Sequence, residues 1–234
     1  MSRTLLGLLV ALLASSAQAG SLEAAPTTIE LSPSQRTGVL HVVNRADHPI
    51  AFQVEAFDWN QDGAADDLAP STVLQVSPPI AELAPGQKQT VRLRADGAPS
   101  QTEQAFRLLV SELPGPSADA RQQVRILLQF SIPVFAPARQ AGDPALTWEA
   151  QREGPDLVLV AANRGARRAK LTGLKVNAAS GALAVPGGDL AYVLAGKARR
   201  WRVSAGAVPP TGTVTLQVGG EAEPPLLVPV RVKD

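Results

Sequence analysis

The sequence predicts an all-β protein built from two β-sandwiches in tandem. Three observations lead to this prediction. Short apolar runs that alternate with polar residues are separated by turns, for which the chain supplies 20 prolines and 19 glycines. No convincing 3.6-residue periodicity follows the N-terminal segment, which argues against helices. The second half of the chain also repeats, weakly, the strand-and-turn pattern of the first half.

The first nineteen residues are predicted to be a signal peptide that is cleaved after Ala19. Arg3 supplies a positive start, the run from Leu5 to Ala14 is apolar, and Ala17-Gln18-Ala19 is a small-x-small cleavage site. The alternative, an uncleaved membrane anchor, is opposed by the short apolar run, because a spanning helix needs about 20 residues. No later stretch is long and apolar enough to span. We therefore expect a soluble, exported chain.

Composition excludes several classes of function. The net charge is +1 with scattered basic residues, so the electrostatic footprint of a nucleic-acid-binding protein is missing. Aromatic residues make up 4% of the chain, which argues against stacking platforms for single strands or sugars. The chain has no cysteine, so neither disulfides nor lipid attachment at a cysteine is available.

The first strands of the first half lie on either side of a turn at Asn44-Arg45-Ala46-Asp47. Leu40 and Val42 alternate with His41 before this turn, and Ile50, Phe52 and Val54 alternate with polar or small residues after it. Two half-buried strands are therefore predicted here.

The stretch from Ser77 to Arg94 predicts an extended Pro-rich segment, a turn at Pro85-Gly86 and a strand. In that strand Val91 and Leu93 fall on one face, and Thr90, Arg92 and Arg94 fall on the other. A further strand follows, with Phe106, Leu108 and Val110 on one face, and a Pro114-Gly115-Pro116 break ends it.

The run from Gln122 to Phe135 is the longest alternating stretch of the chain. Its apolar face comprises Val124, Ile126, Leu128, Phe130, Ile132 and Val134. Pro133 has no N–H, so this strand cannot be fully bonded on both sides and is expected at or near a sheet edge. A long apolar edge promotes aggregation unless a partner strand pairs with it. Besides packing in its own sandwich, this strand is therefore a candidate for donation to a partner.

The domain boundary is predicted where the alternation stops, in a segment rich in Pro, Gly and Ala from Ala136 to Pro144. We expect a first domain over residues 20–136 and a second over residues 145–234. Two repeats of pattern support tandem sandwiches. The strand from Val158 to Ala162 leads into Asn163-Arg164, as the strand from Leu40 leads into Asn44-Arg45, and residues 194–203 resemble residues 83–93.

No motif indicates catalysis or a cofactor. Asp58-x-Asn60-x-Asp62-Gly63 matches the first half of a calcium loop, but Ala69 stands where the bidentate carboxylate is required, so we interpret it as a polar loop between strands that also contains Asp66-Asp67. His41 and His48, the two histidines, have no cysteine or acidic cluster to complete a zinc or iron site. Nucleophile-elbow and phosphate-loop patterns are missing. We expect no enzyme, no metal, no cofactor and no small-molecule substrate.

Several of these segments together resemble the periplasmic pilus (fimbrial) chaperones of the chaperone–usher pathway. The resemblance lies in the export signal, the Ser77–Arg94 string, the segment from Glu103 to Pro114, and the run that ends in Ile132-Pro133-Val134-Phe135. It covers most of the first domain, whereas the second matches mainly by size and strand pattern. It implies two immunoglobulin-like sandwiches in an L shape, a periplasmic location, and a role in fimbrium biogenesis.

The resemblance also implies a mechanism, in which the last strand of the first domain completes a pilin subunit that lacks a strand. The donated side chains would be Val124, Ile126 and Leu128, with Phe130 next. The implied partners are pilin subunits and an outer-membrane usher, with no nucleic acid, and self-association through the free edge is possible.

The sequence departs from the better-known branch of that family at the anchor for the subunit's C-terminal carboxylate. That branch uses an Arg on the first strand and a Lys on the donor strand, and the matching positions here are Thr28 and Pro133. Arg107 is the candidate substitute, and a solvated strand residue is the other interpretation of it. The short connection from Pro114 to Arg121 indicates a short-loop branch.

Two other classes of function remain open from sequence. A structural or adhesive sandwich protein of a surface assembly would normally show a vacant strand position and an N-terminal donor extension, and neither is apparent. An exported hydrolase is disfavoured by the motif search.

Overall fold

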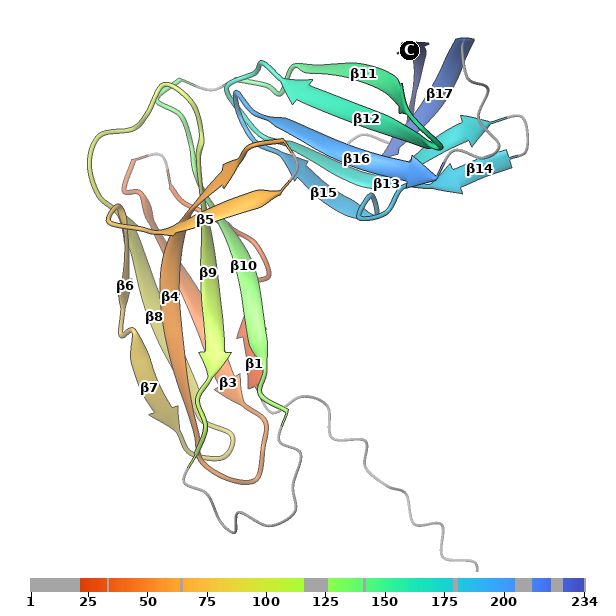
Figure 1. Ribbon diagram of the computed structural model, residues 1–234. Helices are drawn as coiled ribbons and strands as arrows, with labels where there is room; N and C mark the ends of the chain where they lie inside the picture. The colour runs from red at the N-terminus through yellow and green to blue at the C-terminus, as the bar shows by residue number, and fades with distance from the viewer. Residues whose placement is uncertain are drawn as a thin grey trace, which may run out of the picture.

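The computed structural model describes residues 22–32, 34–63, 65–115, 126–140, 142–178, 181–204, 212–219 and 225–233. Every regular element in these ranges is a β-strand, and two sandwich domains meet in an L shape (Figure 1). The predicted all-β, two-sandwich fold is confirmed. The predicted signal peptide and Val124, which is one of the predicted donor residues, lie outside the described residues. Within them, no helix has the length and apolar character needed to cross a membrane.

The first domain packs two sheets face to face. One has the strand order β1-β3-β8-β6, and the other β2-β10-β9-β4-β5 with β7 also paired to β4. The bounds are β1 Leu22–Ala25, β2 Ile29–Glu30, β3 Thr37–Asn44, β4 Ile50–Gln61, β5 Asp66–Pro70, β6 Leu74–Ser77, β7 Ile80–Leu83, β8 Lys88–Ala95, β9 Gln104–Glu112 and β10 Gln129–Ala136.

The second domain is a sheet with the order β14-β13-β17-β18-β11-β12-β16, with β15 paired to β13, and it encloses its own core. The bounds are β11 Leu146–Glu153, β12 Asp156–Asn163, β13 Ala169–Ala178, β14 Gly181–Ala184, β15 Leu190–Val193, β16 Ala198–Ser204, β17 Gly212–Gly219 and β18 Leu226–Lys233. No strand crosses the segment predicted to hold the domain boundary, since β10 ends at Ala136 and β11 begins at Leu146.

The first core is filled by the faces that alternation predicted. Leu40 and Val42 of β3, Phe52 and Val54 of β4, Val91 and Leu93 of β8, and Phe106, Leu108 and Val110 of β9 are all at most 2% exposed. Side chains of a strand point alternately to the two faces of its sheet, so polar residues between them face outward. The hydrophobic pattern therefore fixed which face each strand buries.

The pattern repeat between the two halves corresponds to the same turn built twice. Asn44 and Asn163 are both buried, and each side-chain amide donates to two backbone carbonyls. The acceptors are His48 and Leu83 in the first domain and Arg167 and Val193 in the second. Each Asn also lies opposite a turn with a left-handed glycine, Gly86 (φ 74°) or Gly196 (φ 69°).

Two expectations about local structure need correction. The acidic segment from Asp58 to Pro70 is not a loop but a β-hairpin of β4 and β5, whose paired strands bury Trp59 and Gln61. The predicted donor strand is shorter than expected among the described residues, because β10 begins at Gln129 and residues 126–128 are not in a strand. The backbone of Leu128 still follows β9, since its carbonyl accepts a hydrogen bond from the Glu112 N–H at 2.9 Å.

Candidate functional site at the β10 edge and the interdomain cleft

Strand β10 is bonded along its whole length on one side and over two residues on the other. It pairs with β9 from Gln129 to Ala136, and with the short β2 through Val134 and Phe135. No strand in the described part of the chain pairs with residues 129–133 on that second side. The first five residues of β10 therefore form an exposed edge.

The register explains how a proline fits into this strand. Successive residues of a strand direct their N–H and C=O groups to opposite sides. The Phe135 carbonyl accepts from the Leu31 N–H at 2.8 Å, on the side away from β9. By alternation, Gln129, Ser131 and Pro133 also direct their backbone groups away from β9. The missing N–H of Pro133 thus falls on the exposed edge, where it costs no ladder hydrogen bond.

The apolar face of this segment emerges from the core toward its N-terminal end. Ile132 is 4% exposed, and Phe130 and Leu128 are partly buried against the first-domain core. Ile126 is 79% exposed, the highest value among the exposed large hydrophobic residues described. A row of apolar side chains next to free backbone groups is the arrangement that an added strand of a partner would need.

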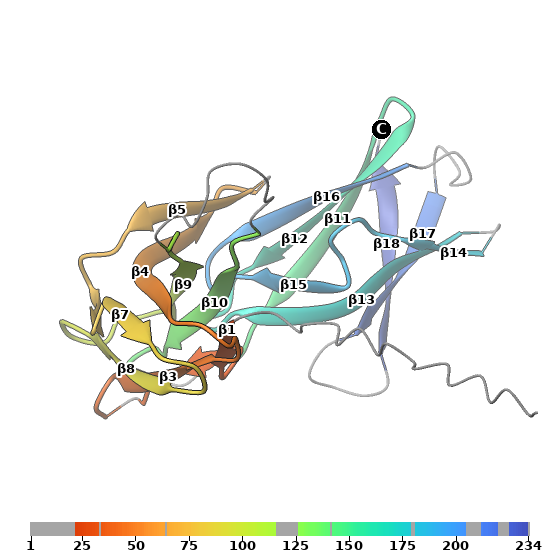
Figure 2. The ribbon, with the colours of Figure 1, turned by 90° about the horizontal axis from the view of Figure 1, so that it is seen from below.

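The two domains enclose a pocket of about 290 Å³ at the inner angle of the L. There β10 faces β15 (Figures 1 and 2). From the first domain, the pocket is lined by Thr28, Arg107 and Pro133. The structure therefore brings together the two positions that replace the usual cations and the predicted substitute. The second domain adds two further cations, Lys170 and Arg199.

Arg107 is held at this pocket by stacking. Its register partners are Pro133 on β10 and Phe57 on β4. Its neighbours in β9, Phe106 and Leu108, point into the core, so Arg107 projects from the outer face of its sheet. Its guanidinium lies 3.7 Å from the centre of the Trp59 ring, a cation–π contact, and its side chain is 17% exposed. Burial lowers the pKa of Arg107, and nearby Asp66 opposes that shift. Arg107 is therefore a positioned cation rather than the freely solvated residue of the other interpretation.

Polar groups tie the two domains together beside the cleft. The Gln61 side chain donates to the Tyr192 carbonyl and accepts from the Leu194 N–H, both at 3.0 Å. At the hairpin tip, the Arg200 N–H donates to the Gly63 carbonyl at 2.7 Å. The β4–β5 hairpin, which was expected to be a solvated loop, thus connects the two domains through hydrogen bonds.

A buried ion pair adds a second tie. Arg168 of the second domain donates to Glu103 through its backbone N–H at 3.0 Å and through Nη1 at 2.5 Å, and it also pairs with Glu30. Its guanidinium lies 3.6 Å from the centre of the Phe135 ring. Burial raises the pKa of Glu103, while the N–H and charge of Arg168 act in the opposite direction. Phe135, Trp59 and Tyr192 pack in one aromatic cluster between the domains.

Sequence reasoning missed the second-domain side of the cleft. Lys170, Arg199 and Tyr192 come from strands whose role at an interface no motif marks. A weak signal existed for Arg199, which lies in the segment that echoes residues 83–93. Asp66 was assigned to a polar loop, yet it lies 3.4 Å from Arg199 and 4.0 Å from Arg107.

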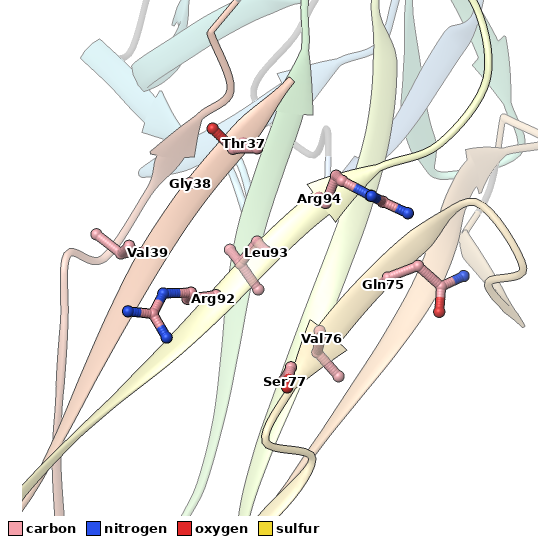
Figure 3. A pocket seen from close by; sticks show the side chains of 9 residues that line it. All are labelled: Thr37, Gly38, Val39, Gln75, Val76, Ser77, Arg92, Leu93 and Arg94. Atoms are coloured by element: carbon pink, nitrogen blue, oxygen red, sulfur yellow. The ribbon is translucent and has the colours of Figure 1, made fainter. Parts of the chain in front are cut away.

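A larger concavity, of about 680 Å³, lies on the other sheet of the first domain, over β3, β6 and β8. Figure 3 shows Arg92 extending toward Val39 and Arg94 extending toward Gln75 across its wall. Its lining residues include no carboxylate, imidazole or thiol. Among the described residues, no group of three or more His, Cys, Asp or Glu could hold a metal ion. The geometry found at β10 and the cleft is instead suited to binding a strand and an anion.

Comparison with known proteins agrees with this geometry. Residues 21–139 match the family model for the pili and flagellar-assembly chaperone, PapD N-terminal domain. No curated protein sequence matches the chain significantly.

Among solved structures, the chain is similar to the CsuC–CsuE chaperone–tip adhesion subunit pre-assembly complex from archaic chaperone–usher Csu pili of Acinetobacter baumannii. The identity is 22% and the TM-score 0.69, over 92% of this chain and 100% of that one. The E. coli chaperone DraB has 19% identity and a TM-score of 0.59, over 91% and 96% of the two chains. The Salmonella enterica SafA pilin–SafB chaperone complex gives 15% and 0.61, over 90% and 95%. At these identities the solved structures show the fold.

Proposed function

The chain belongs to the family of pili and flagellar-assembly chaperones, and we propose that it binds pilin-like subunits by donating the edge of β10 and delivers them to an outer-membrane usher. The family makes it a pilus assembly chaperone. Donation through β10, delivery to an usher, and a periplasmic location after signal-peptide cleavage at Ala19 are the proposed parts. We likewise propose that the chain acts by binding alone, without a cofactor.

The observation that carries the proposal is the open edge of β10 beside an exposed apolar row. Gln129, Ser131 and Pro133 direct backbone groups away from β9. Of the apolar side chains, Ile126 is exposed, and Leu128 and Phe130 are partly buried. A partner strand laid along this edge would gain ladder hydrogen bonds, and the side chains would fill its apolar groove. We propose Val124, outside the described residues, as the first of these side chains.

The energetics are adequate for a stable complex. Full burial of each aliphatic or aromatic side chain contributes roughly 1.5–3 kcal/mol before the costs of association and ordering. Three or four such anchors therefore support a useful affinity. No nucleotide is required, because the subunit's own folding supplies the driving force.

Arg107 is proposed to anchor the C-terminal carboxylate of the subunit. The pocket beside it is lined by Thr28 and Pro133, which cannot neutralise a carboxylate, so the positive charge has to come from elsewhere in the cleft. Arg107 is positioned by Trp59, and a guanidinium presents paired donors that match a carboxylate.

Co-expression with a pilin-like subunit encoded in the same gene cluster tests the function. We expect a soluble complex of one chaperone and one subunit, and we expect the subunit expressed alone to aggregate or be degraded. A subunit that is equally soluble and abundant without the chaperone would contradict the proposal. It would favour the alternative of a structural or adhesive component.

The anchor role predicts a loss of affinity in Arg107→Ala. Removing a charge-assisted hydrogen bond to the subunit carboxylate should weaken the complex by about 1.5–3 kcal/mol, which is roughly 10- to 150-fold in Kd. Titration calorimetry or a competition assay with a purified subunit measures it. Arg92→Ala, on the outer face of the opposite sheet, is the matched control and should leave Kd unchanged. A loss below about 1 kcal/mol in Arg107→Ala excludes the anchor role.

A further inference from the structure

A carboxylate lies next to two of the cations that line the interdomain cleft. Asp66, the first residue of β5, places Oδ1 3.4 Å from Arg199 Nη1 and Oδ2 4.0 Å from Arg107 Nη2. It therefore lies between one cation of each domain. Lys170 is exposed, and no carboxylate of the described residues lies within 4.0 Å of its ammonium group. Three cations and one anion make this cluster net positive.

Asp66 is held in this position by the same residue that joins the domains. The Gln61 amide nitrogen donates to Asp66 Oδ1 at 3.0 Å and also to the Tyr192 carbonyl. Gln61 is 5% exposed, whereas the Asp66 side chain is 31% exposed and accessible from the solvent side. The buried Gln61 thus orients Asp66, so that the Asp66 carboxylate lies near Arg107 and Arg199.

The contacts of Asp66 with the two arginines leave donors unused. At 4.0 Å the Arg107 contact is an ion pair without a hydrogen bond. The Arg107 side chain makes no hydrogen bond of 3.5 Å or less with any described residue. One face of its guanidinium is covered by the Trp59 ring. An incoming carboxylate could therefore make the closer, two-pronged contact that Asp66 does not make.

We propose that Asp66 is an internal competitor for the carboxylate site. In the free protein it partly neutralises Arg107 and Arg199, and a bound carboxylate takes over these cations while Asp66 stays hydrogen-bonded to Gln61. The ligand class is the free carboxylate end of a polypeptide, so the inference rests on the proposed function. Asp66 thereby limits the affinity of the site, and Arg199 brings the second domain into it.

The physical reason is that the local charge decides how strongly the cluster attracts an anion. Asp66 lowers the positive potential at the cleft, and its carboxylate repels another carboxylate of the same sign. Replacing it with asparagine keeps the size of the side chain and removes the charge. Because the group is partly exposed, solvent screens the gain, and we expect an increase in affinity of about three- to tenfold.

The test uses two synthetic peptides and the intact protein. An acetylated Gly-Ala-Ala peptide with a free carboxylate is titrated against the same peptide with a C-terminal amide, and binding is followed by NMR at the Trp59 indole N–H, which is buried next to Arg107. The Trp148→Phe and Trp201→Phe variants assign that resonance. We expect Asp66→Asn to bind the acid three- to tenfold more tightly than the wild type and the amide no better. Arg199→Gln should weaken acid binding.

Asp67→Asn is the matched control, because Asp67 is the adjacent exposed residue and makes no ion pair with a described residue. It should leave acid binding unchanged. Equal acid affinity in the wild type and Asp66→Asn, or an equal gain for acid and amide, overturns the proposal, as does no acid binding to either protein. If the subunit complex still forms in any of these cases, the chaperone function stands without the competitor. If the acid binds as expected but no subunit complex forms, the carboxylate site stands and the chaperone function is contradicted.

Discussion

Ile126→Asp is expected to abolish co-purification with a pilin subunit while leaving the chaperone folded. Ile126 is 79% exposed in the free protein, so the substitution removes little of the protein's own core. In the proposed complex the same position enters an apolar groove of the subunit. The variant then loses roughly 1.5–3 kcal/mol of burial and must in addition desolvate a carboxylate, so we expect Kd to rise more than 100-fold.

The matched control is Ile80→Asp, which introduces the same charge at a site 56% exposed in the same domain. Ile80 lies on β7, paired with β4 and away from β10. The control should co-purify with the subunit as the wild type does. Unchanged co-purification of Ile126→Asp would remove the donor-strand role from β10, and equal loss in both variants would indicate a general effect of the added charge. Thermal unfolding of both variants checks that the fold is intact.

Arg168→Met is expected to lower the free energy of unfolding by about 3–5 kcal/mol, because it leaves a buried carboxylate without its charged partner. The side chains of Arg168 and Glu103 are each 6% exposed, whereas Glu30 is 55% exposed and can be solvated. The methionine keeps an apolar side chain against Phe135, so the main loss is electrostatic. Urea unfolding at neutral pH measures the effect.

The double variant Arg168→Met/Glu103→Gln identifies the cause, because it removes the uncompensated charge. It should recover part of the lost free energy, and a double variant as unstable as Arg168→Met would show that lost packing dominates. The effect should also depend on pH. Without the guanidinium, the burial that raises the pKa of Glu103 is opposed only by the backbone N–H of residue 168, which remains in the variant.

A carboxyl group whose pKa is higher in the folded than in the unfolded state stabilises the fold below its unfolded value, about 4.3. That contribution is lost as the pH rises through the folded pKa. The deficit of Arg168→Met relative to the wild type should therefore be smaller at pH 5 than at pH 8. A deficit that is independent of pH, or larger at pH 5, would contradict this explanation.

Local alternation was enough to predict the strands that build the sandwiches. The faces of β3, β4, β8 and β9 follow from a side-chain period of two, and tertiary contacts did not override it. The Asn44 and Asn163 turns were visible as a repeat because the same backbone groups need the same side chain in both domains. The exposed edge of β10 was also predictable, since a missing N–H at Pro133 is a local property.

The interdomain site was not predictable, because it is formed by residues far apart in the sequence. Nothing near Asp66 indicates that its hairpin reaches β16 of the other domain, where Gly63 and Arg199 form a bridge. Lys170 has no local motif either, and charges on strand surfaces are usually solvated.

The sequence by itself determined the all-β class, the buried faces and the apolar pattern of the segment that we propose as the donor, because hydrophobic period and turn chemistry act over a few residues. Tertiary structure decided that Arg107 stacks on Trp59 and forms an ion pair with Asp66. It also decided that the second domain supplies Lys170 and Arg199 to the cleft. These properties depend on the angle at which two sandwiches dock. That angle is set by contacts such as Gln61 with Tyr192 and Arg168 with Glu103, each of which spans more than sixty residues of chain.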